Sequence, residues 1–524
     1  MEKTINVLFL AAEALPFVKI GGLADVAGAL PQALRALSIE EAGDVKLDVR
    51  LVIPLHSVIR TESATLRPVA SFPIMRDGAE LIAQVYESRL GELPVYFISG
   101  NPISESASVY SSNASLDGEK YTFFSIAALE MLNHINWEPD ILHANDWHTG
   151  VAAYALQLRH WDGEMPKTKT ILTVHNLPFL GPDLTESLAA YGQALAQTDL
   201  PDWAHTLPLP LGLWASQKIV AVSPTYAKEM LTPELGSGLE NFLTIHKESL
   251  TGIINGIDVE SFDPQTDPEI LHNFSSENLQ DRSSNKATLQ KLMGLKTDAD
   301  IPLFGVVSRM ETQKGIDLVL DALGRLKNIP WQAVILGTGD PLLEKRAKRL
   351  EKRMPERVKV EIRYDGKLAR KIYAGADVFL MPSRYEPCGL SQMIAMRYGS
   401  IPIVRSTGGL KDTVMHGETG FTFEKETAKA FLASIREALD VFKNHEDWQR
   451  LQRNSMTQDF SWANSARPRG VAAVRIWYFA SFASNLSLAR KAFRPSSLAA
   501  FIELALALDR LFLAASSSLS HLGF

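Results

Sequence analysis

The chain has 524 residues, of which 46% are hydrophobic and 22% charged, and its mean hydropathy is −0.02. A chain of this length is too long for one hydrophobic core, so we expect two domains, with three as the alternative. The formal charge of −7 and the isoelectric point near 6.0 argue against a nucleic-acid-binding protein, because neutralising phosphates requires a basic surface. The composition therefore indicates a globular protein that does not bind nucleic acid.

Cysteine content and hydropathy indicate the compartment. Cys388 is the single cysteine, which excludes an intramolecular disulfide framework and is typical of a reducing compartment. Residues 1–10 contain an acidic residue too early, and an apolar stretch too short, for a secretory signal. No apolar run reaches the roughly 20 residues of a membrane span, because Arg and Asp interrupt the one in the tail. We therefore expect a cytoplasmic protein with no membrane partner.

Apolar segments alternate with helical patterns, which is typical of parallel sheets covered by helices on both sides. The first series of expected strands covers residues 6–11, 47–54, 82–87, 95–99, 141–143, 170–174, 218–224 and 252–258. The second series covers 302–309, 331–336, 358–362, 377–381 and 401–404. A polar passage at 262–286 is predicted to be a hinge and linker. We predict an α/β fold of two Rossmann-like domains, 1–250 and 251–466, that face a central cleft and precede an atypical tail at 467–524.

A glycine turn connects the first predicted strand to the first predicted helix. It contains Lys19, Gly21 and Gly22, and Asp25 stands at the start of the helix. The glycines allow the backbone to approach a diphosphate closely, the helix N-terminus offers unpaired N–H groups, and the lysine adds a mobile positive charge. The spacing matches neither the dinucleotide-binding fingerprint nor the P-loop, so a simple tight turn is the alternative.

Polar and aromatic residues follow two further strands of the first series. The segment 143–150 reads HANDWHTG and the segment 173–176 reads TVHN. His143 and His148 suggest a metal, but no further ligands stand at a diagnostic interval, so we expect none. Aromatic, amide and imidazole groups suit a sugar better, because its hydroxyls need donors and acceptors and its ring needs a flat surface.

Loops of the second series carry a carboxylate and two cations. Glu386 lies in the loop at 383–390, between a strand and a helix N-terminus, where α/β sheets bind ligands. Arg309 and Lys314 occupy a strand end and a helix start, the placement needed to hold a leaving diphosphate. The alternative is ordinary loops with solvated charges. Cys388 in the same loop is interpreted as a small packed residue rather than a nucleophile.

Taken together, these segments resemble the bacterial glycogen synthase and plant starch synthase family. The resemblance covers about residues 5–466 and rests on KIGGL at 19–23, TVHN at 173–176, SR at 308–309 with QKG at 313–315, EPCGL at 386–390 and TGGL at 407–410. It implies the glycosyltransferase B fold, with the acceptor on the N-terminal domain and the nucleotide sugar on the C-terminal domain. It further implies a retaining transfer of glucose from ADP-glucose to the non-reducing end of an α-1,4-glucan such as glycogen, with no metal and no cofactor.

The resemblance implies a role for each matching residue. Glu386 would hold the glucose hydroxyls, the backbone carbonyl of His175 would face the anomeric centre, and Arg309 and Lys314 would neutralise the leaving ADP. The other matching positions would bind substrate: Lys19, Gly21, Gly22, Asp25, Tyr110, Asp146, Trp147, Asn176, Ser391, Thr407, Gly408 and Gly409. The physical chemistry agrees, because a glycosyl transition state is cation-like at the sugar and anion-like at the departing diphosphate.

The chain departs from the family pattern at individual positions and in its tail. Ser391 stands where many relatives have Thr, and Asn145 replaces a common His. After residue 466 the family expects a Tyr-containing helix that crosses back to the N-terminal domain, whereas this chain has Pro468 and Gly470, which would end a helix. We interpret the tail as a frameshift-like replacement; a lineage-specific tail that associates with a membrane or a partner is the alternative.

Two other functions stay open on the sequence. The altered tail allows a catalytically impaired homologue that binds glucan without turnover, and the shared fold allows a glycosyltransferase that uses another donor. Release of ADP from ADP-glucose in the presence of glycogen separates the three hypotheses. The sequence makes no prediction about the oligomeric state.

Overall fold

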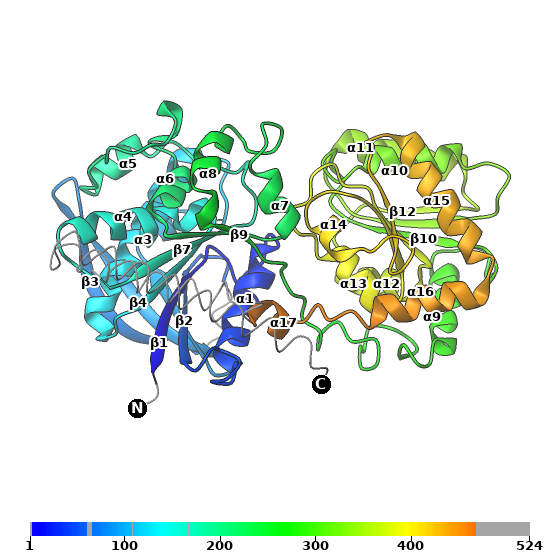
Figure 1. The fold of residues 1–524 in the computed structure, drawn as a ribbon, viewed down its shortest axis with the longest axis horizontal. Coiled ribbons are helices and arrows are strands. Elements are labelled where there is room, and N and C mark those ends of the chain that lie inside the picture. Colours follow the sequence, from blue (N-terminus) through cyan, green and yellow to red (C-terminus); the bar gives the residue numbers. More distant parts are fainter. Residues whose placement is uncertain (1–2, 60–64, 107, 166, 468–524) are drawn as a thin grey trace, which may run out of the picture. The chain divides into compact units, whose positions relative to one another are not determined.

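Two mainly parallel sheets organise the chain (Figure 1). The computed structural model describes residues 3–59, 65–106, 108–165 and 167–467, and the predictions made for the tail at 468–524 lie outside them. Within the described residues, no helix is long and apolar enough to span a membrane.

The first sheet has nine strands among the described residues, in the order β3-β4-β5-β2-β1-β6-β7-β8-β9. Their bounds are β1 (Thr4–Leu10), β2 (Lys46–Pro54), β3 (Arg67–Arg76), β4 (Ala79–Leu90), β5 (Leu93–Ser99), β6 (Ile141–Asn145), β7 (Lys169–Val174), β8 (Lys218–Ala221) and β9 (Leu250–Gly252). β4 pairs with β3 and β5 in antiparallel fashion, and the other neighbours are parallel. The parallel strands follow the order of a doubly wound sheet, whose switch point lies between β1 and β6.

The second sheet is fully parallel, and its six strands in the described part of the chain follow the order β12-β11-β10-β13-β14-β15. Their bounds are β10 (Leu303–Val307), β11 (Gln332–Leu336), β12 (Val358–Glu361), β13 (Val378–Met381), β14 (Ile401–Arg405) and β15 (Phe421–Phe423). Every residue of β11 and β13 is buried, as expected for parallel strands covered on both faces. The switch point of this sheet lies between β10 and β13.

Helices connect the parallel strands and pack on the sheets. Those of the first half are α1 (Leu23–Ala36), α2 (Asn101–Ser104), α3 (Ala114–Ile135), α4 (Gly150–Trp161), α5 (Thr185–Ala190), α6 (Pro208–Ala215), α7 (Pro224–Glu229) and α8 (Glu240–Ile245). Those of the second half are α9 (Gln280–Leu292), α10 (Ile316–Arg325), α11 (Pro341–Arg353), α12 (Gly366–Gly375), α13 (Ser391–Arg397), α14 (Gly408–Thr413), α15 (Ala428–Phe442), α16 (His445–Met456) and α17 (Trp462–Ala466). Single 3-10 turns form η2 (Trp147–Thr149), η3 (Asp202–Ala204) and η4 (Lys247–Ser249).

The predicted α/β fold of two Rossmann-like sheets is confirmed, with differences in individual strands. The strand expected at 252–258 is wrong, because β9 ends at Gly252 and residues 253–256 form no strand. Two strands were not predicted from the sequence: β3, which contains Pro68 and Pro73, and β15, which has three residues. Proline weakens a strand pattern, and three residues are too few to show a period.

The chain returns to the first half at its described end. The backbone N–H of Ile257 donates to Phe460 O at 2.8 Å, and α17 packs against α1. Gly256 permits this crossing, because a Cβ there would lie 2.6 Å from the backbone nitrogen of Trp462. Arg467 then forms an ion pair with Glu41 at 2.9 Å. The described residues up to 467 thus already bring the C-terminal segment back to α1, before the point at which the sequence departs from the family pattern.

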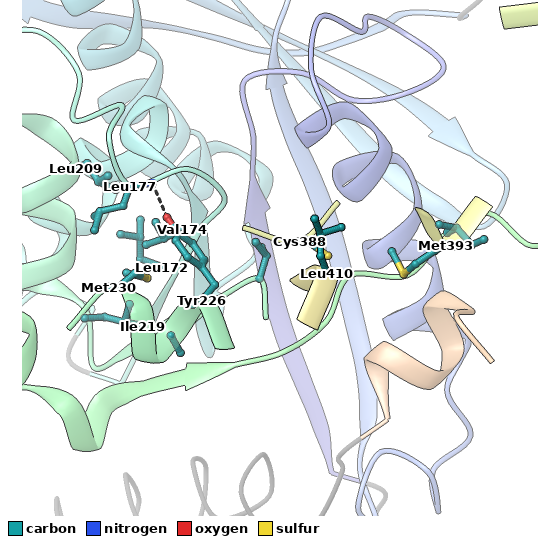
Figure 2. Packing of buried hydrophobic residues seen from close by; sticks show 14 of the residues in the cluster. Leu172, Val174, Leu177, Leu209, Ile219, Tyr226, Met230, Cys388, Met393 and Leu410 are labelled. Atoms are coloured by element: carbon teal, nitrogen blue, oxygen red, sulfur yellow. Dashed lines mark hydrogen bonds between the residues drawn. The ribbon is translucent and has the colours of Figure 1, made fainter. Parts of the chain in front are cut away.

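One hydrophobic cluster contains buried residues from both sheets. It includes Leu172, Val174 and Tyr226 from the first half and Cys388 and Leu410 from the second (Figure 2). Burial of apolar surface stabilises a folded protein by about 25 cal/mol per Å². This shared cluster therefore stabilises the contact between the two halves.

Candidate active site

The loop between β13 and α13 carries a buried carboxylate. Glu386 is 5% exposed, and its Oε2 accepts hydrogen bonds from Lys314 Nζ at 2.7 Å and from Ser383 Oγ at 3.0 Å. Lys314 comes from the loop after β10, so the pair joins the two strands that flank the switch point of the second sheet. The alternative of a solvated glutamate is wrong, because a carboxylate this buried requires a paired cation or hydrogen-bond donors.

Glycines at the start of α14 give the Glu386 loop its form. A Cβ on Gly408 would lie 1.9 Å from Glu386 O, and a Cβ on Gly409 would lie 2.2 Å from Cys388 O. The N–H of Gly409 donates to the carbonyls of Glu386 and Pro387 at 3.2 and 3.1 Å. These glycines allow α14 to pack closely against the backbone of the Glu386 loop. Their contact with substrate stays a prediction.

Cys388 packs in the hydrophobic core instead of facing solvent. It is 5% exposed, and burial raises the pKa of its thiol to about 12. The thiolate is the reactive form of cysteine, so a thiol held protonated is not a nucleophile. The structure therefore agrees with its interpretation as a small packed residue.

The glycine turn after β1 is held by a carboxylate that the sequence analysis did not single out. Glu13 is 1% exposed and accepts the backbone N–H groups of Ile20 and Gly21, the latter at 3.0 and 3.1 Å to its two oxygens. Lys19 Nζ forms an ion pair with Asp25 Oδ1 at 2.7 Å. An acidic residue directly after an apolar strand was the available signal for Glu13.

A cleft of about 1040 Å³ is lined by residues of both halves. Four of the predicted site residues line it: Lys19, Asp25, Arg309 and Ser391. The ring of Tyr364, in the loop after β12, also lines the cleft and is 85% exposed. An exposed aromatic face in a cleft can stack on a flat ring, and no sequence pattern indicated a role for this tyrosine.

The predicted residues after β6 and β7 are joined by hydrogen bonds. Asp146 Oδ1 accepts the backbone N–H of His175 at 2.7 Å and, at a longer 3.4 Å, that of Asn176. Burial raises the pKa of Asp146 to about 7. Its φ of +54° is unusual for a residue with a side chain and stores strain of about 1–3 kcal/mol, a feature typical of functional positions.

The imidazole of His175 has a defined tautomer. Asn145 Nδ2 donates to Leu10 O at 2.9 Å, which orients its amide so that Oδ1 faces His175 Nε2 at 2.9 Å. The proton of the neutral ring therefore resides on Nε2. Burial lowers the pKa of His175 to about 3, so the ring is uncharged near pH 7. Asn176 Oδ1 is buried and has no hydrogen-bond partner among the described residues, so it can accept one from a ligand.

Trp147 and Tyr110 pack around a common neighbour. Their rings lie 4.0 and 4.9 Å, centroid to centroid, from the ring of His148, which is itself buried. Burial, followed by the charge of Glu13, raises the pKa of the Tyr110 hydroxyl well above its usual range. Trp147 and Tyr110, both predicted to bind substrate, therefore belong to one packed aromatic cluster.

Residues at the start of α7, in the first half, also form hydrogen bonds to the Glu386 loop. Ser223 Oγ donates to Pro387 O at 2.6 Å. The Tyr385 hydroxyl donates to that of Tyr226 at 2.5 Å, and Tyr226 in turn accepts the N–H of Leu177 (Figure 2).

A carboxylate from α7 also reaches the start of α14. Glu229 Oε1 accepts both Thr407 Oγ1 and the N–H of Gly408 at 2.9 Å. The Thr407 hydroxyl and the Gly408 amide thus bond to the protein itself, and a contact of these residues with substrate stays a prediction.

Each cation expected at the diphosphate has an internal carboxylate partner. Lys19 pairs with Asp25, Lys314 with Glu386, and Arg309 with Glu311 at 2.7 Å. A polyanionic ligand can exchange with these carboxylates, most easily at Arg309, whose side chain is 59% exposed. Among the described residues, no group of three His, Cys, Asp or Glu side chains could hold a metal ion. The arrangement thus offers cations for an anionic leaving group and a carboxylate for a developing positive charge.

Comparisons with known proteins show which families the chain is similar to. The family model "Starch synthase catalytic domain" matches residues 6–245, and "Glycosyl transferases group 1" matches residues 294–455. Glycogen synthases from Syntrophotalea carbinolica and Thermotoga maritima are 38% and 37% identical, each over 88% of this chain and 97% of the relative.

Solved structures extend the similarity to the fold. The catalytic domain of starch synthase IV from Arabidopsis thaliana, bound to ADP and acarbose, is 32% identical, with a TM-score of 0.79 over 88% of this chain and 97% of that one. A sucrose-phosphate synthase from Thermosynechococcus elongatus is 18% identical, with a TM-score of 0.56 over 92% of this chain and 100% of that one, and shares the fold alone.

Proposed function

We propose that this chain, which belongs to the glycogen synthase and starch synthase family of glycosyltransferases, transfers glucose from ADP-glucose to the non-reducing end of an α-1,4-glucan with retention of configuration. In this reaction the bond between the anomeric carbon and the diphosphate breaks, and a bond to the acceptor hydroxyl forms on the same face of the sugar. The acceptor proton leaves with the diphosphate.

The observation that carries the proposal is the buried ion pair between Lys314 and Glu386 at the switch point of the second sheet. Oxocarbenium character on the glucose favours a nearby carboxylate, and the departing ADP favours a cation, so both groups are required within one small volume. Lys314 neutralises the leaving diphosphate as Glu386 turns to the sugar. Arg309 and Lys19, on the walls of the cleft, complete the positive charge around the phosphates.

The first half supplies the neutral polar groups. His175 is uncharged near pH 7, so it contributes hydrogen bonds and its backbone carbonyl, not a positive charge. The unpartnered Asn176 Oδ1 is suited to a sugar hydroxyl. Trp147 and Tyr110 provide apolar surface for the acceptor glucan.

The nucleotide occupies the cleft of about 1040 Å³ in this proposal. The exposed Tyr364 ring stacks on the adenine base. We further propose that residues 1–250 form the acceptor domain and residues 251–466 the nucleotide-sugar domain, and that the protein acts in the cytoplasm.

The test is the release of ADP from ADP-glucose in the presence of glycogen, measured by a coupled assay. We expect turnover with ADP-glucose, and elongation shown by incorporation of labelled glucose into the glucan. Turnover with UDP-glucose but not with ADP-glucose would mean that UDP-glucose is the donor. Retention on a glycogen gel without release of ADP would mean a glucan-binding protein instead of a synthase.

A further inference from the structure

We infer that Glu13 is a positioning residue that holds the glycine turn in the form needed to receive the donor diphosphate. This inference rests on the proposed function and adds to it a group that does not touch the substrate. Glu13 lies in the loop that follows β1, one of the two strands that flank the switch point of the first sheet.

Both oxygens of the Glu13 carboxylate accept hydrogen bonds from the turn. It is 1% exposed, and it accepts the consecutive backbone N–H groups of Ile20 and Gly21. The Tyr110 hydroxyl lies near this carboxylate, and burial, followed by the charge of Glu13, raises the pKa of Tyr110 well above its usual range. Hydrogen bonds from backbone N–H groups to a carboxylate are about twice as strong as those between neutral groups, so these bonds hold the turn in place.

This arrangement sets which groups of the turn are left for a ligand. No acceptor among the described residues takes the N–H of Gly22, and a Cβ on Gly22 would meet nothing within 4 Å. Lys19, one residue before the bonded Ile20, lines the cleft. Glu13 therefore occupies the amides of Ile20 and Gly21 and leaves the Gly22 amide for a ligand, next to the Lys19 ammonium, which a phosphate can take over from Asp25.

Contacts between Leu15 and α1 also hold the turn in place. Leu15 N donates to Ala24 O at 3.0 Å, and Gly28 lets α1 approach, since a Cβ there would lie 2.6 Å from Leu15 O. Because α1 is held in place by these contacts, loss of the Glu13 carboxylate would change the path of the turn at residues 19–21. Lys19 is part of this segment and would move with it. The expected consequence is weaker binding of the nucleotide and not of the glucan.

The test is Glu13→Gln, which keeps the shape of the side chain but turns an NH₂ group toward one of the two backbone donors. The matched control is Glu351→Gln, because Glu351 also accepts a backbone N–H, that of Val360 at 3.0 Å, and is not among the residues that line the cleft. Glu13→Asp, which restores a carboxylate on a shorter side chain, tests rescue.

We expect Glu13→Gln to weaken ADP binding by about ten- to hundredfold, because an unsatisfied buried donor carries a penalty of that size. Glycogen affinity should be unchanged, Glu351→Gln should bind ADP as the wild type does, and Glu13→Asp should recover part of the loss. ADP affinity is measured by calorimetry and glycogen affinity by gel retardation.

The outcomes separate this inference from the proposed function. Equal ADP affinity in Glu13→Gln and wild type, or an equal loss in Glu351→Gln, would overturn the role of Glu13 and leave the synthase proposal intact. An inactive wild type that still binds ADP would remove the synthase proposal, while the ADP affinities of the variants would still decide the role of Glu13. A wild type that does not bind ADP would overturn both.

Discussion

Replacing Glu386 by Gln separates catalysis from nucleotide binding. The variant keeps an oxygen that can accept from Lys314 and Ser383 but removes the charge that opposes the developing positive charge on the sugar. Loss of one preorganised electrostatic group costs about 2.7–4 kcal/mol of transition-state stabilisation, so we expect kcat to fall by about 10²–10³. ADP should bind equally well or more tightly, because Lys314 no longer pairs with a full negative charge.

The assay combines ADP release under saturating substrate with calorimetric binding of ADP. Lys314→Ala is the complement, and it should weaken both turnover and ADP binding. Asp321→Asn is the control, because it removes an ion pair between Asp321 on α10 and Arg346 on α11. The two side chains are 45% and 39% exposed, respectively. A decrease in kcat of less than about tenfold for Glu386→Gln, or a loss of ADP binding larger than that of Lys314→Ala, would refute the assigned roles.

Three further predictions follow from side chains around the site. Tyr364→Ala should raise the KM for the nucleotide sugar by about tenfold, since stacking on a base is worth about 1–3 kcal/mol, and an unchanged KM would exclude stacking. Gly409→Ala should lower the free energy of unfolding by at least about 2 kcal/mol, because its Cβ would lie 2.2 Å from Cys388 O; a denaturant midpoint equal to wild type would contradict the packing. Asp146 has a pKa raised to about 7 by burial, so the folded state retains a proton that the unfolded state releases above about pH 4, and wild-type stability should fall from pH 4 to 7. Asp146→Asn cannot titrate, so its Tm relative to wild type should increase over that range, and a constant difference would be inconsistent with the raised pKa.

The positions of the site residues along the sequence were predictable for a topological reason. Asp146, His175, Arg309 and Glu386 each stand at or soon after the end of an apolar run of strand length, and Lys19 stands in the turn that follows another such run. In a parallel sheet the carboxyl ends of the strands share one edge, so the sequence predicts that Asp146 lies near His175 at one sheet, and that Arg309 and Glu386 lie at one edge of the other. The alternation of strands and helices likewise fixed the fold class.

Strand edges and supporting contacts were not predictable. The antiparallel strand β3 includes prolines that disrupt its pattern, and its place depends on pairing with β4. Glu229 is an ordinary helical glutamate in the sequence, yet it bonds to Thr407, 178 residues away. No local pattern encodes a contact between residues so far apart in the chain.

The sequence by itself determined the fold class, the order of the site loops and the residue types that the chemistry needs. The tertiary structure alone decided their pairing: that Glu386 is buried against Lys314, and that Glu13 occupies the amides of the glycine turn. The physical reason is that periodicity records which residues are buried, whereas the partner of a buried charge is set by side chains brought together from distant strands.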